Sequence, residues 1–145
     1  MSWSKEVNIK SAATWLTRKV TLIEEKDRLL HVQKANIDLT GSYVEIRTIY
    51  RGTVYWVEFG EANIGGEKNK TRPAVVLSPN RLNKGHTVVV APISKQFQKK
   101  LNGLPKFNNH YLLKKSEYPT LERDSVVKFE DIRSVDVVRI GNILT

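Results

Sequence analysis

Beyond Gly41 the chain is a series of short runs rich in Val, Ile and Tyr, separated by Gly, Pro and Asn, and this pattern narrows the possible folds most. Runs of four to eight β-branched and aromatic residues between turn residues are typical of strands. Six such runs are present, at 53–59, 72–78, 87–93, 110–113, 125–129 and 142–144. Short strands at this spacing predict a small antiparallel barrel or a strongly bent sheet. Residues 42–50 fit either a linker or an extra strand.

Residues 5–39 carry a helical period instead. Five apolar residues recur every seven positions and therefore share one stripe of a helix: Ile9, Leu16, Ile23, Leu30 and Ile37. Most charged residues of the segment fall outside this stripe, so we expect a long amphipathic helix. A helix of this length exceeds what one small domain can cover. We therefore expect part of the stripe to meet a second chain, and we divide the protein into a helical extension (1–41) and a barrel (42–145).

The charge balance is basic, with 24 Lys and Arg against 15 Asp and Glu, a formal net charge of +9. The excess lies in the second part, because residues 51–145 hold 16 basic and 9 acidic residues. Such a surplus is common in proteins that bind polyanions, although it also serves solubility. The chain has no cysteine, which excludes disulfides, zinc–thiolate sites and cysteine nucleophiles. Without a signal-like or membrane-spanning apolar run, we expect a cytoplasmic protein that does not enter a membrane.

Two long connections, 60–71 and 95–109, are rich in Gly, Asn and Lys. Connections of this length are often functional. The second interleaves aromatic and basic residues: Lys95, Phe97, Lys99, Lys100, Lys106 and Phe107. Cations suit the phosphates of a single-stranded nucleic acid and aromatic rings suit its bases. A solvated basic loop with two phenylalanines in the core fits the sequence equally well.

Four blocks follow in order: RGTVYWVEFG (51–60), GGEKNKTRPAVVLSPN (65–80), TVVVAPISK (87–95) and RDSVVKFEDIRSVDVVRI (123–140). Together they resemble the MazF/PemK family of toxin endoribonucleases, and four ordered blocks are far more specific than one. The resemblance implies a mainly β (α+β) fold, an SH3-like barrel of the MazF/PemK/CcdB type that forms a homodimer. It also implies metal-independent cleavage of single-stranded RNA (mRNA) at short sequences. The products would carry a 2′,3′-cyclic phosphate and a 5′-hydroxyl, and a cognate antitoxin protein would be a partner.

The family's catalytic positions match Arg72, Ser94 and Glu130 in this chain. The guanidinium of Arg72 suits the non-bridging phosphate oxygens, the hydroxyl of Ser94 can donate to the phosphate, and Glu130 is the candidate base. Structural alternatives are an ion pair for Arg72 and local backbone contacts for Ser94. If the last long strand continues, Lys128 shares the face of Glu130 and Asp131 points away. The RNA-binding candidates are Glu67, Lys68, Lys70, Lys95, Phe97, Lys99, Lys100 and Lys128.

The chain departs from the family pattern at two loop positions. Gly66 stands where some relatives have a histidine, and Lys70 replaces a common glycine. None of the three histidines is assigned a catalytic role, and no metal or cofactor motif is present. The N-terminal helix is outside the pattern, and we expect it to extend the dimer contact or to fold over the RNA groove. Two other functions stay open, a non-catalytic barrel that binds RNA or protein and a CcdB-like gyrase inhibitor.

Overall fold

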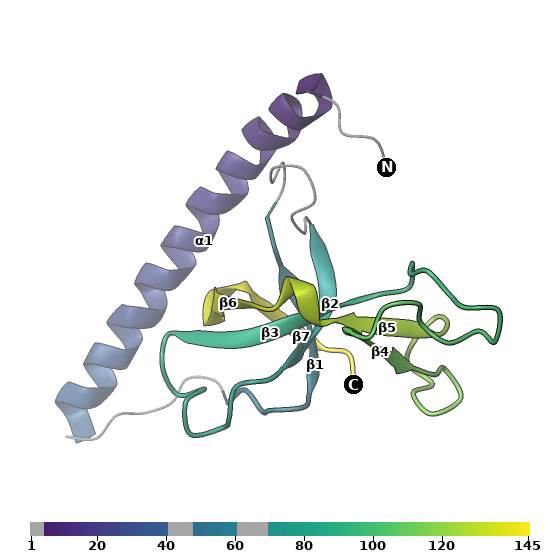
Figure 1. The fold of residues 1–145 in the computed structure, drawn as a ribbon. Helices are drawn as coiled ribbons and strands as arrows, with labels where there is room; N and C mark the ends of the chain where they lie inside the picture. Colours follow the sequence, from purple (N-terminus) through teal and green to yellow (C-terminus); the bar gives the residue numbers. More distant parts are fainter. Residues whose placement is uncertain (1–4, 41–47, 61–69) are drawn as a thin grey trace. The chain divides into compact units, whose positions relative to one another are not determined.

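The computed structural model describes residues 5–40, 48–60 and 70–145 (Figure 1). These residues belong to two compact units. The first contains a single unbroken helix, α1 (Lys5–Thr40), which confirms the helix predicted at 5–39. The apolar stripe of this helix repeats every seven residues, and four of its members are exposed: Ile9, Leu16, Ile23 and Leu30. Across the described ranges, no helix combines the length and apolarity needed to cross a membrane.

The second unit contains the strands. Their bounds are β1 (Val54–Glu58), β2 (Thr71–Val76), β3 (Thr87–Ser94), β4 (His110–Leu113), β5 (Ser125–Lys128), β6 (Arg133–Asp136) and β7 (Ile140–Ile143). All six predicted runs are confirmed as strands. The sequence pattern missed β6, since only Val135 of its four residues is buried and its strand form depends on pairing with β3. Residues 48–50 are not a strand, and 42–47 lie outside the described residues.

The strands form one antiparallel sheet in the order β4-β5-β3-β2-β1-β7, with β6 also paired to β3. The long strand β3 organises this sheet. Its first half pairs with β6, where Val90 lies opposite Arg133, and its last residues pair with β5, where Ser94 lies opposite Val126. β6 and β5 therefore flank opposite ends of β3 (Figure 1). The predicted mainly β, α+β class is confirmed.

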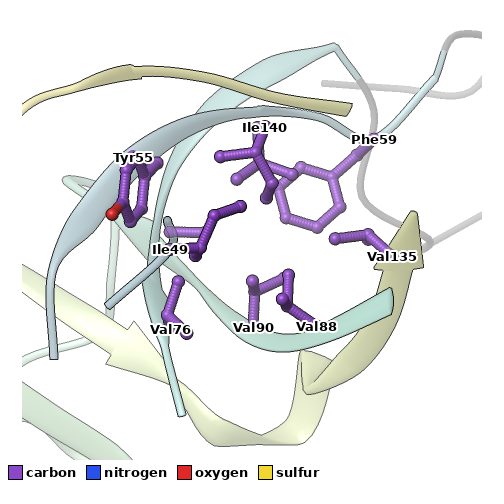
Figure 2. Packing of buried hydrophobic residues seen from close by; sticks show 10 residues of the cluster. Ile49, Tyr55, Phe59, Val76, Val88, Val90, Val135 and Ile140 are labelled. Carbon is purple, nitrogen blue, oxygen red and sulfur yellow. The ribbon is translucent and has the colours of Figure 1, made fainter. Parts of the chain in front are cut away.

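The sheet curls around its main core (Figure 2). Alternation along each strand sends successive side chains to opposite faces. In β2, Ala74 and Val76 enter the main core, while Val75 packs with a second cluster on the other face. The main core contains Ile49, Tyr55, Val57, Phe59, Ala74, Val76, Val88, Val90, Val135 and Ile140. The second cluster is centred on Val54, Ala91, Ile93 and Val127.

The 95–109 connection, expected as a long loop, contains a short hairpin. The backbone N–H of Lys106 donates to the carbonyl of Gln98 at 2.8 Å, and Lys99 bridges Pro105. Gly103 closes its turn at φ 82°, a left-handed conformation that favours glycine. The paired segment returns the chain to its starting point. Phe97 and Phe107, just outside the paired residues, consequently line the same pocket.

Candidate active site

Arg72 and Ser94 meet because of the register between β2 and β3. Ala74 lies opposite Pro92 in this antiparallel pair. Arg72 precedes Ala74 by two residues and Ser94 follows Pro92 by two, so both lie at the same end of the strand pair. Both line one pocket of about 420 Å³. The structure thus brings together two of the three catalytic residues predicted from the sequence.

The walls of this pocket, here called the Arg72 pocket, come from distant segments. The side chain of Trp56, which lies across from Pro73 in the sheet, is 40% exposed and lines it. Lys95 and Gln96 continue from Ser94, and Glu122 comes from the β4–β5 connection. The pocket therefore combines fixed cations, a hydroxyl and an exposed aromatic ring. These groups can hold a phosphodiester beside a base.

The Ser94 hydroxyl is held by the chain immediately after it. Its Oγ donates to the carbonyl of Gln96 at 3.0 Å and accepts from the backbone N–H of Gln96 at 3.2 Å. A side chain that bonds the backbone two residues later forms a small turn. This turn ends β3. To donate to a phosphate oxygen, the hydroxyl has to rotate away from the Gln96 carbonyl.

Lys95 forms an ion pair with Glu122 at the edge of the Arg72 pocket. The hydrogen bond and charge of Lys95 are the main causes that hold the pKa of Glu122 below its ordinary value. The Nζ of Lys115 also donates to the Glu122 carbonyl at 3.1 Å. The Glu122 carboxylate is thus paired with Lys95, a residue that the sequence analysis predicted to bind RNA.

Glu130 lies in a different pocket. β4 and β5 place His110 opposite Lys128, and a 3₁₀ turn, η1 (Phe129–Asp131), then returns Glu130 towards His110. His110 Nε2 lies 2.7 Å from Glu130 Oε1, and Asn109 Nδ2 donates to Oε2 at 3.0 Å. The condition for Lys128 and Glu130 to share a strand face is not met, because β5 ends at Lys128 and η1 follows it. Lys128 and Glu130 nevertheless line the same pocket.

The ionisation of Glu130 reflects these contacts. Partial burial opposes its charged form, but hydrogen bonds from His110 and its own backbone, together with the charge of Lys128, outweigh that effect. The pKa of Glu130 is consequently lowered. The carboxylate is therefore ionised at neutral pH and acts as a hydrogen-bond acceptor.

The second pocket, here called the Glu130 pocket, has a volume of about 520 Å³. Gln96 lines both pockets, so the two adjoin. The remaining lining residues supply aromatic, amide and charged groups: Phe97, Gln98, Phe107, Asn109, His110, Lys128 and Glu130. Lys99 Nζ lies 5.1 Å from the Phe97 ring centroid, and Lys106 Nζ lies 5.7 Å from that of Phe107.

The other predicted RNA-binding residues are placed unevenly. Lys99 and Lys100 are exposed on the hairpin, and Lys70 is exposed at the start of β2 with a φ of 64°. Glu67 and Lys68 lie outside the described residues, as does Gly66. Sequence reasoning missed His110, Asn109 and Glu122. The pairing of the 110–113 and 125–129 runs was the available signal, because it places His110 across from Lys128.

Among residues 5–40, 48–60 and 70–145, no cluster of three or more His, Asp or Glu side chains is arranged to hold a metal ion. The chemistry available in the described pockets comes from Arg, Lys, Ser, Glu and His side chains.

A family model matches the part of the chain that contains the strands. The family model described as "PemK-like, MazF-like toxin of type II toxin-antitoxin system" matches residues 50–145. Endoribonuclease MazF of Staphylococcus saprophyticus is 34% identical over 96 residues, which cover 66% of this chain and 74% of that protein. The solved structure of Mycobacterium tuberculosis toxin MazF-mt6 aligns with a TM-score of 0.46 at 16% identity, covering 63% of this chain and 75% of that one. α1 precedes the segment matched by the family model.

Proposed function

Because the chain belongs to the PemK-like, MazF-like toxin family of type II toxin–antitoxin systems, we propose that it cleaves single-stranded mRNA in the cytoplasm at short recurrent sequences. The observation that carries this proposal is the single pocket shared by Arg72 and Ser94. An arginine and a hydroxyl at the same strand end can hold a phosphodiester from two sides. The +9 net charge favours binding of the polyanionic substrate.

The proposed reaction is an internal transfer. The ribose 2′-oxygen attacks the adjacent phosphorus while the bond from phosphorus to the 5′-oxygen breaks. The 2′-hydroxyl loses a proton and the leaving 5′-oxygen gains one, which gives a 2′,3′-cyclic phosphate and a 5′-hydroxyl. Arg72 stabilises the charge on the non-bridging oxygens, and Ser94 donates a hydrogen bond to one of them.

Glu130 fits the role of proton acceptor poorly. Its lowered pKa makes it a weak base, and it lines the Glu130 pocket rather than the one shared by Arg72 and Ser94. Efficient general bases have pKa values near the working pH. We propose that Glu130 binds RNA and that cleavage rests on charge stabilisation by Arg72 and Ser94.

Purified protein incubated with long single-stranded RNA in EDTA tests the activity. Cleavage at a recurrent short sequence with 5′-hydroxyl products is expected. Arg72→Ala should lower the rate by about 10²–10³-fold, as loss of one charge-stabilising donor does elsewhere. The control is Arg51→Ala, which removes an exposed arginine that lines neither pocket. This variant should cleave RNA at the wild-type rate. Intact RNA across diverse sequences would contradict the nuclease and favour a non-catalytic binding barrel. Inhibition of DNA supercoiling by gyrase would favour the CcdB-like alternative.

We also propose a homodimer that buries the second face of the sheet. The cluster around Val54 and Val127 packs on this face, where an apolar pocket of about 450 Å³ remains open. Tyr111 lines this pocket and is 60% exposed. A second copy of the chain would remove this apolar surface from water. A cognate antitoxin is the other expected protein partner.

Sedimentation of the purified protein tests the dimer. Tyr111→Glu should shift the protein towards monomer, whereas Leu82→Glu, at an exposed position on the β2–β3 connection, should not. We propose in addition that residues 42–145 fold alone and that the exposed apolar stripe of α1 extends the dimer contact. Removal of residues 1–41 should then weaken dimerisation, and an equally stable truncated dimer would contradict this role of the helix.

A further inference from the structure

The Glu130 pocket is not used by the cleavage chemistry at Arg72 and Ser94, yet it has three kinds of groups in one place. Aromatic rings, side-chain amides and the cation of Lys128 line it around a carboxylate. It adjoins the Arg72 pocket through Gln96. A strand of RNA held at its phosphodiester by Arg72 therefore has a neighbouring site within reach.

Its aromatic wall is formed by the hairpin. Phe97 and Phe107 come from the two ends of this hairpin, and the Phe107 side chain is 45% exposed. Lys99 lies near the Phe97 ring, which leaves a cation beside a stacking surface. Exposed rings flanked by cations bind unpaired bases and their phosphates. An ordinary solvated loop would not direct both rings to one pocket.

The polar side of the pocket is rigidly supported. The His110 side chain is only 5% exposed, and Phe107 packs edge-on against it with ring centroids 5.4 Å apart. The Nδ1 of the His110 ring is buried without a hydrogen-bond partner, and its Nε2 lies against Glu130. His110 and Asn109 together fix both oxygens of Glu130. The side chain of Glu130 is still 38% exposed.

The chemistry of Glu130 determines what the pocket can read. A carboxylate offers about four lone pairs, and Asn109 and His110 each contact one of its two oxygens. The 38% exposed carboxylate keeps acceptor capacity for an N–H donor. Adenine, cytosine and guanine present an exocyclic amino group to such an acceptor. Uracil presents a single N–H flanked by two carbonyl oxygens. These oxygens are repelled by the negative charge of the Glu130 carboxylate.

We propose that the Glu130 pocket binds one unpaired nucleobase next to the cleaved phosphodiester, and that Glu130 selects a base with an exocyclic amino group over uracil. This proposal rests on the proposed RNA-cleaving function. Phe97 and Phe107 supply the stacking surface, and Lys128 and the hairpin lysines hold the flanking phosphates. His110 and Asn109 are positioning residues, because they orient the carboxylate.

The test separates binding from cleavage. RNA oligonucleotides methylated at every 2′-oxygen cannot undergo the reaction, so their affinities report binding alone. A randomised pool of such oligonucleotides is selected on the wild-type protein, on Glu130→Gln and on Glu117→Gln, and then sequenced. Glu117 is an exposed glutamate that lines neither pocket, so its variant is the matched control. The same variants are then given a randomised cleavable RNA.

Wild type and Glu117→Gln should select an amino-bearing base at one position beside the cleavage site. Glu130→Gln should admit uracil there about tenfold more often, which is the lower range expected for one base contact. A Phe97→Ala/Phe107→Ala variant should bind the selected oligonucleotide roughly tenfold more weakly. Thermal unfolding of each variant verifies that it is folded.

Two results would overturn the inference. Unchanged base preference in Glu130→Gln would remove its selecting role. Unchanged affinity in the double phenylalanine variant would remove the base site. If wild type selects a base by affinity but cuts no RNA, the proposed function fails while the pocket stands. If wild type cuts RNA and Glu130→Gln keeps its preference, only the pocket inference fails.

Discussion

His110 Nε2 lies 2.7 Å from Glu130 Oε1, and this contact joins the first residue of β4 to the turn that follows β5. It holds the carboxylate on the hairpin side of Gln96, away from the pocket of Arg72 and Ser94. The molecule thus separates the Arg72 pocket, where we propose that the phosphodiester binds, from the polar and aromatic Glu130 pocket. Under these two proposals, base recognition can vary without changing the groups at the scissile phosphate.

The Glu130 contacts predict a pH dependence of stability. Because the folded pKa of Glu130 is lowered, its contribution is fully present above the unfolded carboxyl pKa, about 4.3. It is lost as the pH falls through the lower folded value. The free energy of unfolding of wild type should therefore exceed that of Glu130→Gln at neutral pH, and the difference should shrink below about pH 4.

Urea unfolding at a series of pH values measures this difference. Glu117→Gln provides the control, because Glu117 lies outside both pockets. The difference in unfolding free energy between Glu117→Gln and wild type should not show the pH dependence expected for Glu130→Gln. A Glu130→Gln difference that grew on acidification would show that the carboxylate is not stabilised by His110 and Lys128.

The position of Ser94 predicts that cleavage requires a hydroxyl group at residue 94 and tolerates the additional methyl group of threonine. Ser94→Ala removes both the donor and the turn with Gln96, so the maximal cleavage rate should fall about 10²–10³-fold. Ser94→Thr keeps the hydroxyl and should retain most of the activity. Single-turnover cleavage of a defined RNA measures both. Equal activity of the alanine and threonine variants would mean that the Ser94 hydroxyl has no role in cleavage and serves only to form the turn that ends β3.

Most of the sheet could be predicted from the sequence, because alternating Val and Ile runs between turn residues are a local signal. The exception, β6, shows the limit. Its residues Arg133 and Ser134 are exposed, and the strand exists because β3 offers an unpaired edge there. That edge arises from the bend of the whole sheet, which no local pattern records.

The site divides in the same way. Arg72 lies near the start of β2 and Ser94 ends β3, and these antiparallel strands pair directly, so their meeting follows from register. The position of Glu130 depends on η1, a single turn whose three residues carry no helix signal. His110 was missed because its importance comes from the residue it contacts, 20 positions later. Glu122 was missed for a similar reason, since Lys95 is 27 positions away.

The ion pair of Lys95 and Glu122 predicts a gain of RNA affinity. Glu122→Gln removes the carboxylate that competes with phosphate for Lys95, so RNA should bind several-fold more tightly at low salt. The salt dependence should also steepen, by about 0.7 in the slope of log affinity against log salt for one added contact to single-stranded RNA. Fluorescence anisotropy with an uncleavable RNA at several salt concentrations measures both quantities.

A second measurement in the Lys95→Ala variant tests whether the gain in affinity depends on Lys95. In Lys95→Ala the further change Glu122→Gln should have little effect, because the cation it would release is absent. A gain of the same size in both backgrounds would instead reflect the removal of a general negative charge. Glu117→Gln controls for that effect in the wild-type background.

Lys70 predicts a conflict between stability and RNA binding. Its φ of 64° is unfavourable for a residue with a Cβ, and its carbonyl is held by the backbone N–H of Phe59 at 2.9 Å. Lys70→Gly relieves this strain but increases the freedom of the unfolded chain, so a net stabilisation of about 0.5–1 kcal/mol is expected. Lys70→Ala keeps the strain and loses the charge. Urea unfolding should rank glycine above alanine and lysine, while RNA affinity should fall equally in both variants if the ammonium group contacts phosphate. A glycine variant no more stable than the alanine variant would show that the backbone relaxes at this position, and unchanged affinity in both would remove Lys70 from the RNA-binding surface.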